Sequence, residues 1–215
     1  MGTIRGRFAS TVAILLSLFV PTHAEAATES PLRLVLYVYD YAGVAPDVRA
    51  AAAEITRQIY AAIGVDIVWV DRCPVACHIA FSREAHDDTT DANLMMLTIL
   101  PDGMTSREFP AGVMGGAPER GNVATAYFGR IRAFAFERNV LPATLLGHVV
   151  AHEVGHLLLR EGHARQGLMR ARWVDNELLQ AQVGRLGFTA TQGSRIRSRL
   201  GVVQNASNLA TQMQR

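Results

Sequence analysis

The segment from Leu141 to Leu159 constrains the fold of this chain of 215 residues more than any other. It reads LPATLLGHVVAHEVGHLLL, and its length, with a proline at the first turn, predicts a helix. Because apolar residues lie nearly all round this helix, we expect it to be buried. Its ionisable residues are His148, His152, Glu153 and His156. Burying such groups is costly unless they are hydrogen-bonded or bind a metal, so the fold must supply partners for them.

Two of these histidines have the spacing of metal ligands. His152 and His156 are four residues apart, which places them on one face of the helix. Two imidazoles so placed can bind one zinc ion through ring nitrogens at about 2.0–2.1 Å. Glu153 can then act as general base toward a zinc-activated water, and this arrangement is similar to the H-E-x-x-H motif of zinc peptidases. The alternative is a structural helix whose core histidines are only hydrogen-bonded.

A zinc site that is open to water needs a third protein ligand, and His163 is the leading candidate. It follows His156 by seven residues, which on a continuous helix would place it about 10.5 Å further along the axis. The helix must therefore end first and the chain must bend back. Gly162 provides a residue suited to such a break. The alternative for His163 is a surface histidine that follows the end of a helix.

The chain resembles the metzincin clan of zinc peptidases over His152 to Trp173. Metzincins carry H-E-x-x-H-x-x-G-x-x-H and then a tight turn with a methionine, the Met-turn. The residues that match these roles are His152, Glu153, His156, His163 and Met169. Two positions depart from the pattern: Leu159 stands where the glycine falls, and Gly162 stands where the third histidine falls. The third histidine is thus one residue late.

The resemblance implies a zinc metallopeptidase that binds one Zn²⁺ and takes a peptide or protein as its substrate. It also implies an α+β fold of zincin type, in which a twisted mixed sheet packs on the buried active-site helix and C-terminal helices follow. By the same analogy, Asn122–Phe128 is expected to be the edge strand along which an extended peptide lies. A zinc-stabilised binding or scaffold protein without catalysis is the alternative function.

Glu177 is a second candidate for the third ligand. It lies 21 residues beyond His156 in an Asn-Glu pair. Gluzincins, a related group of zinc peptidases, take their third ligand from a downstream helix, often as Asn-Glu. The segment bearing Met169 and the position of His163 favour His163.

The start of the chain has the layout of a secretory signal peptide. Arg5 and Arg7 precede an apolar run from Thr11 to Val20, and Ala24-Glu25-Ala26 fits a cleavage site. We therefore expect residues 1–26 to be removed and the product to be secreted or periplasmic, with no stable membrane insertion. An uncleaved membrane anchor is the alternative. In an oxidising compartment, Cys73 and Cys77 are expected to form a disulfide.

The composition limits the classes of partner that this chain is expected to bind. The formal net charge is +2 and 49% of the residues are hydrophobic, so the chain is globular and gives no indication of nucleic-acid binding. Neither repeats nor linkers appear, so we expect one catalytic domain over 27–203, a flexible tail over 204–215 and a monomer. The predicted strands are 31–41, 65–70, 77–82, 93–100 and 122–128. The predicted helices are 46–63, 141–159, 174–186 and 189–200.

Overall fold

The structure is a computed structural model that describes residues 32–71, 93–101, 112–118 and 120–213, with only the backbone described over 203–213. The signal peptide over 1–26, the cysteine pair Cys73 and Cys77, and the short strand over 77–82 lie outside the described residues. They therefore stay predictions.

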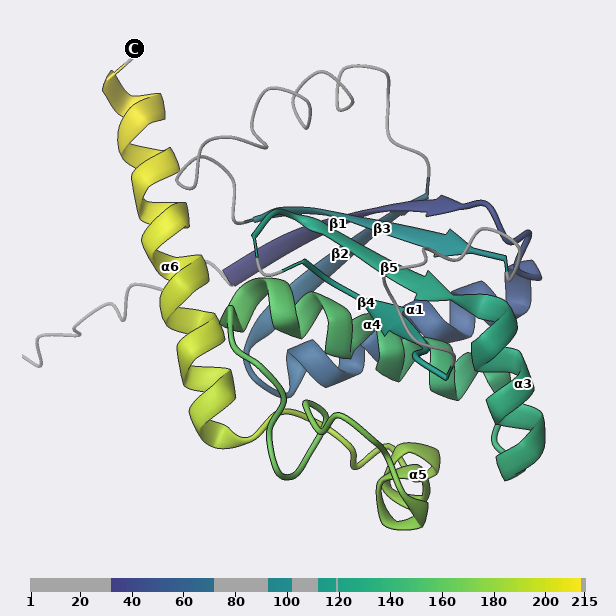
Figure 1. Cartoon of the computed structure of the whole chain (residues 1–215). Coiled ribbons are helices and arrows are strands. Elements are labelled where there is room, and N and C mark those ends of the chain that lie inside the picture. Colours follow the sequence, from purple (N-terminus) through teal and green to yellow (C-terminus); the bar gives the residue numbers. More distant parts are fainter. Residues whose placement is uncertain (1–31, 72–92, 102–111, 119, 214–215) are drawn as a thin grey trace, which may run out of the picture. The chain divides into compact units, whose positions relative to one another are not determined.

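Five strands form one mixed sheet in the order β2-β1-β3-β5-β4 (Figure 1). The strands are β1 (Leu32–Asp40), β2 (Val65–Asp71), β3 (Leu94–Leu100), β4 (Gly115–Gly116) and β5 (Val123–Tyr127). All neighbours are parallel except β4 and β5, which are antiparallel. The strands predicted at 31–41 and 65–70 are confirmed, and they pair in parallel through the helix predicted between them.

The edge of the sheet differs from the prediction. We expected the strand at 122–128 to be the edge, but β5 pairs with β3 on one side and with β4 on the other. Among the described strands, β4 is therefore the edge next to β5. It was missed because its two residues are glycines, which have no side chain to pack on a sheet and give no strand signal.

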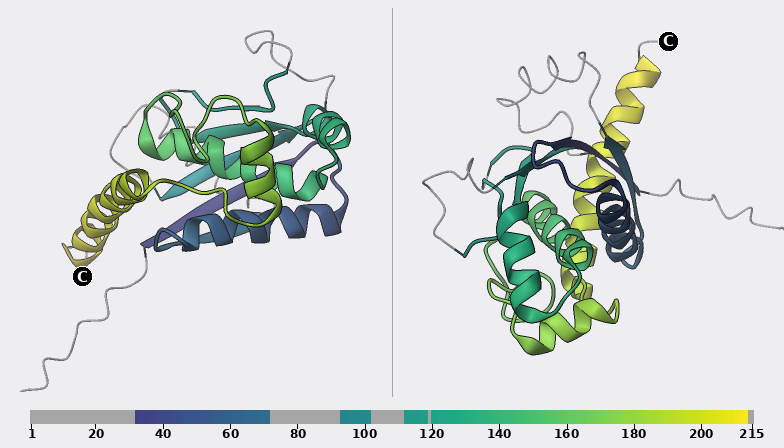
Figure 2. Two further views of the ribbon diagram at one scale, coloured as in Figure 1. Left: turned by 90° about the horizontal axis from the view of Figure 1, so that it is seen from below. Right: turned by 90° about the vertical axis from the view of Figure 1, so that its right-hand side faces the viewer.

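Two helices cover one face of the sheet (Figure 2). The full set of helices among the described residues is α1 (Pro46–Ala61), α3 (Phe128–Arg138), α4 (Pro142–Leu159), α5 (Asp175–Gln182) and α6 (Ala190–Met213). Helices α1 and α4 pack beneath the strands, and α4 is buried along nearly its whole length, as its composition predicted. The predicted α+β fold, with a mixed sheet on a buried helix and helices at the C-terminal end, is confirmed.

Two helical segments were not predicted. Helix α3 continues directly from β5 and buries Ile131 and Ala135, which are four residues apart. It ends at Asn139 in the left-handed conformation, a common helix terminus. The last helix runs on to Met213, so the predicted end at Leu200 is wrong and the tail from 204 has a helical backbone. Ala, Leu and Gln in this stretch favour a helix and no proline interrupts it.

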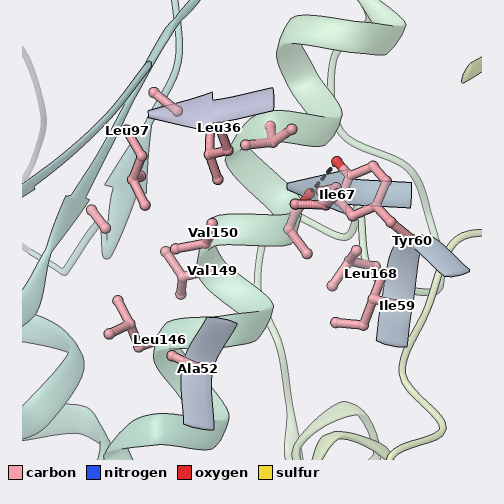
Figure 3. Close-up of a cluster of buried hydrophobic side chains, with 14 of the residues drawn as sticks. Leu36, Ala52, Ile59, Tyr60, Ile67, Leu97, Leu146, Val149, Val150 and Leu168 are labelled. Carbon is pink, nitrogen blue, oxygen red and sulfur yellow. Dashed lines mark hydrogen bonds between the residues drawn. The ribbon is translucent and has the colours of Figure 1, made fainter. Parts of the chain in front are cut away.

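Helix α4 is fixed against α1 by two hydrogen bonds that cross between the helices. The Thr56 hydroxyl donates to the carbonyl of Gly147 at 3.1 Å, and the Tyr60 hydroxyl donates to that of Ala151 at 3.1 Å (Figure 3). Both donors and both acceptors are one helical turn apart, so the two bonds set the rotation of α4. Gly147 allows the close approach, because a Cβ there would lie 2.8 Å from the Ile55 Cβ.

The same interface forms the centre of the hydrophobic core. The strands contribute Leu36, Ile67 and Leu97, whose side chains point toward α4 (Figure 3). Among the described residues, no helix combines the length and apolar character that crossing a bilayer requires.

Candidate metal centre

Three histidines converge at the end of α4. His152 and His156 come from the helix, and His163 comes from the segment that follows it. Each offers one nitrogen, and these nitrogens all lie within 4.8 Å of one another. The Nε2 atoms of His152 and His156 are 3.0 Å apart. This is the one such group of three among the residues that the structure describes.

Backbone carbonyls fix the tautomers of the two helix histidines. The Nδ1 atom of His152 is 2.7 Å from the oxygen of Leu168, and that of His156 is 3.0 Å from the oxygen of Glu161. A carbonyl oxygen only accepts, so each Nδ1 carries the proton and each Nε2 is left with a lone pair. Histidines that bind a metal commonly donate their other ring N–H to a backbone carbonyl in this way, which fixes the orientation of the ring.

The distance between the two Nε2 atoms fits a shared metal ion. Two unprotonated nitrogens 3.0 Å apart repel each other unless something positive lies between them. Nitrogen ligands about 2.05 Å from a tetrahedral zinc would be about 3.3 Å apart, close to the spacing found here. The residues present therefore fit a zinc ion held by His152, His156 and His163.

The helix ends at Leu159, as predicted, but the break is at Arg160 and not at Gly162. Helix α4 stops at Leu159, and Arg160 adopts the left-handed conformation with φ of 50°. Gly162 has no positive φ. The bend back is held by the Ala164 N–H, which donates to the carbonyl of Met169 at 2.7 Å.

Arg160 accounts for the late position of His163. In the metzincin pattern the glycine stands three residues before the third histidine. Arg160 stands three residues before His163, so it has the place of that glycine and α4 is one residue longer. Glycine adopts the left-handed conformation without a Cβ penalty, whereas Arg160 adopts it at a cost.

Met169 packs against the active-site helix. Its sulfur lies 2.7 Å from where a Cβ of Gly155 would be, and the Phe188 ring is 2.9 Å from the same point. Gly155 is thus required for this close contact, and Met169 is fully buried. The neighbouring Leu168 carbonyl accepts from Trp173 Nε1 at 3.1 Å as well as from His152, which fixes its direction.

Glu177 is engaged elsewhere and is not part of the cluster. Its carboxylate accepts from Arg170 at 2.8 Å and from the Val174 N–H at 3.1 Å, which ties the Met169 segment to the start of α5. Burial raises the pKa of Glu177, but the hydrogen bonds from Val174 and Arg170 and the charge of Arg170 outweigh it and lower the pKa. The geometry therefore favours His163 over Glu177 as the third ligand.

Glu153 is buried in α4 and follows His152 directly in the sequence. Its side chain is 7% exposed, and burial raises the pKa of Glu153 to about 8. Burial also lowers the pKa of His152 to about 4, and the neighbouring His156 and His163 add to this effect against the Leu168 hydrogen bond. The pKa of His163 is lowered by burial and by His156. Neutral imidazoles are the form that binds a metal.

His148 lies one turn before His152 but outside the cluster. Its Nδ1 donates to the Thr144 carbonyl at 2.7 Å, and its ring meets Trp173 edge to face. His148 is therefore a packed histidine of α4 and not a member of the cluster.

The site also depends on groups that sequence reasoning did not identify. The carbonyls of Leu168 and Glu161 orient the histidines, but backbone atoms give no residue-type signal. Trp173 carries no pattern that marks it. Gly115 of β4 lies against Glu153, and a glycine carries no side-chain signal for such a contact.

Solved structures that this chain resembles at a distance include two archaeal proteins. A zinc-dependent peptidase from Methanocorpusculum labreanum matches with a TM-score of 0.47 and 14% identity, over 75% of this chain and 99% of that one. Archaemetzincin from Methanopyrus kandleri matches with a TM-score of 0.45 and 16% identity, over 79% and 97%. No protein-family model and no curated protein matches the sequence. The function proposed for this chain therefore rests on its own side chains.

Proposed function

We propose that this chain is a zinc-dependent peptidase in which His152, His156 and His163 hold one zinc ion. The observation that carries the proposal is the 3.0 Å separation of the Nε2 atoms of His152 and His156, whose rings each contact a backbone carbonyl through Nδ1, with a third histidine beside them. When bound, the metal supplies a Lewis acid that polarises a carbonyl and lowers the pKa of water.

Glu153 is the proposed general base. Its neighbour His152 is a proposed ligand, so its carboxylate reaches the same space without being needed to hold the metal. A positive charge nearby favours the ionised carboxylate and offsets the effect of burial. Glu153 accepts a proton from water and then returns it to the leaving amine.

The edge strand β4 is the proposed contact for an extended peptide. Gly115 lies opposite Ala126, and the adjacent hydrogen bond runs from the Tyr127 N–H to the Met114 carbonyl at 2.9 Å. Gly115 is therefore in a pair that is not hydrogen-bonded, and its N–H and C=O face away from β5. A peptide added at this edge would pass beside Glu153.

The direct test combines elemental analysis with a substitution at the base. Purified protein is expected to hold close to one equivalent of zinc, and Glu153→Gln is expected to keep the zinc while hydrolysis of a mixed peptide library falls by at least about 100-fold. Zinc below about half an equivalent would count against the metal site. If wild type cleaves nothing and the substitution changes nothing, a non-catalytic zinc-stabilised binding protein is the better description.

We also propose that the protein is exported, on the basis of the signal-like segment over 1–26. Mass spectrometry of the product from an exporting host is expected to show a chain that begins near Ala27. In that product Cys73 and Cys77 are expected to be joined, which alkylation with and without reductant reveals as a mass difference. A retained N-terminus would support the membrane-anchor alternative, and a monomer is expected from light scattering.

A further inference from the structure

Gly115 in the edge strand makes an unusually close approach to Glu153. A Cβ built on Gly115 would lie 2.6 Å from Oε1, 2.7 Å from Cγ and 2.9 Å from Cδ of Glu153. Contacts below 3.0 Å are ones that real Cβ atoms essentially never make. The Glu153 carboxylate thus occupies the space that a side chain at position 115 would need.

Backbone conformation does not explain this glycine. Gly115 has no positive φ, so an alanine would meet no strain in the main chain. The three heavy atoms nearest to a side chain at this position all belong to Glu153.

The carboxylate, rather than the strand, would yield to a side chain at 115. Strand β4 is fixed by the bond from the Tyr127 N–H to Met114 and by the Arg130 guanidinium, which donates to the Val113 carbonyl at 2.8 Å. The backbone of Glu153 is fixed within α4. Only the torsions of the Glu153 side chain are left to relieve the overlap.

We propose that Gly115 is a positioning residue, whose lack of a side chain sets where the Glu153 carboxylate lies against β4. The catalytic consequence rests on the proposed peptidase function, whereas the steric relation does not. A general base moved by about 1 Å loses about 100-fold in rate.

The first experiment is a cycle of two substitutions, read in kinetics. Gly115→Ala is expected to lower kcat by about 100-fold while zinc content and KM change by less than about threefold. Glu153→Asp shortens the side chain by one methylene and vacates the contested space. In that background, Gly115→Ala is expected to lower kcat by less than about threefold. Gly187→Ala is the matched control, because a Cβ there meets nothing within 4 Å.

Two results would overturn the proposal: no loss of kcat in Gly115→Ala, or the same loss in both backgrounds. The second would mean that alanine perturbs the strand and not the carboxylate.

A second cycle keeps the inference testable if wild type hydrolyses no peptide. In metal-free protein, Gly115→Ala is expected to lower Tm by about 5 °C, as overpacking does. In a Glu153→Ala background the same change is expected to lower Tm by less than about 1 °C. Equal shifts would refute the positioning role, whereas unequal shifts in a protein without hydrolysis would refute only the peptidase proposal.

Discussion

The candidate metal centre is built from two regions that are held in different ways. His152 and His156 lie on α4, whose rotation is fixed by the core and by the Thr56 and Tyr60 hydroxyls. His163 is exposed and lies on an irregular segment that is tied to the Met169 segment by the Ala164 N–H.

Because of this difference, the core alone positions the two helix histidines, whereas the position of His163 depends on the turn that follows α4. A pair of ligands on a packed helix is in place before any metal binds, so little further ordering is needed. A ligand on an exposed segment with few buried contacts belongs to the part of a fold that opens most easily. The helix pair should therefore dominate metal affinity, and the third histidine should tune it.

The largest expected effect is on zinc affinity. Zinc binding energies of about 10–16 kcal/mol shared by a few ligands predict that His152→Ala weakens binding by at least about 100-fold. The loss of zinc affinity in His163→Ala should be about ten times smaller than the loss in His152→Ala, since water can replace an exposed ligand. Competition with a chromophoric chelator measures both. A greater loss from His163→Ala than from His152→Ala would contradict the ranking.

The same glycine-to-alanine change should have a large effect on stability in one region and a small effect in the other. Gly147→Ala places a Cβ 2.8 Å from the Ala52 carbonyl oxygen and should lower the free energy of unfolding by about 2 kcal/mol. Gly162→Ala meets nothing within 4 Å and should change it by less than about 0.5 kcal/mol. Urea unfolding of both variants measures the two changes in the free energy of unfolding. Equal losses would mean that the crossing of α1 and α4 is packed no more tightly than the segment at Gly162.

Glu177 links the Met169 segment to α5, and its removal should depend on pH. Glu177→Gln is expected to cost about 1.5 kcal/mol at neutral pH, because a charged acceptor of two hydrogen bonds is lost. Because the folded pKa of Glu177 lies below the ordinary 4.5, this stability is present above that pH and disappears as pH falls through the lowered pKa. Unfolding at pH 7 and at pH 3 tests it. A difference that grows toward low pH would reverse the sign.

The smallest effect concerns the left-handed residue that ends α4. Arg160→Gly and Arg160→Ala both lose the side chain, but only alanine keeps the cost of a positive φ. The glycine variant should therefore be more stable than the alanine variant by about 1 kcal/mol. Thermal unfolding of the pair measures this, and equal stability would show that the turn relaxes in both.

The buried helix and its histidines could be predicted because their signals are local. An apolar run with His152 and His156 four residues apart specifies its own helix, its burial and a shared face. The parallel strands were equally readable from runs of β-branched and apolar residues. These elements satisfy several requirements at once, so their patterns are strong.

The remaining features depend on contacts that the local sequence does not encode. The break at Arg160 is selected by the backbone bond from Ala164 to Met169, so the glycine at 162 was a misleading signal. Strand β4 forms through its pairing with β5, and its two glycines give no sequence pattern from which a strand could be predicted. Because β4 pairs with β5, β5 is an interior strand and not the edge strand that was expected.

The most direct test of the account is a crystal structure of the zinc-loaded protein with anomalous data collected at the zinc absorption edge. The account predicts a single strong peak about 2.0–2.1 Å from a nitrogen of each of His152, His156 and His163, with Glu177 still bound to Arg170. A peak at Glu177 instead of His163, or no peak between the two helix histidines, would contradict it.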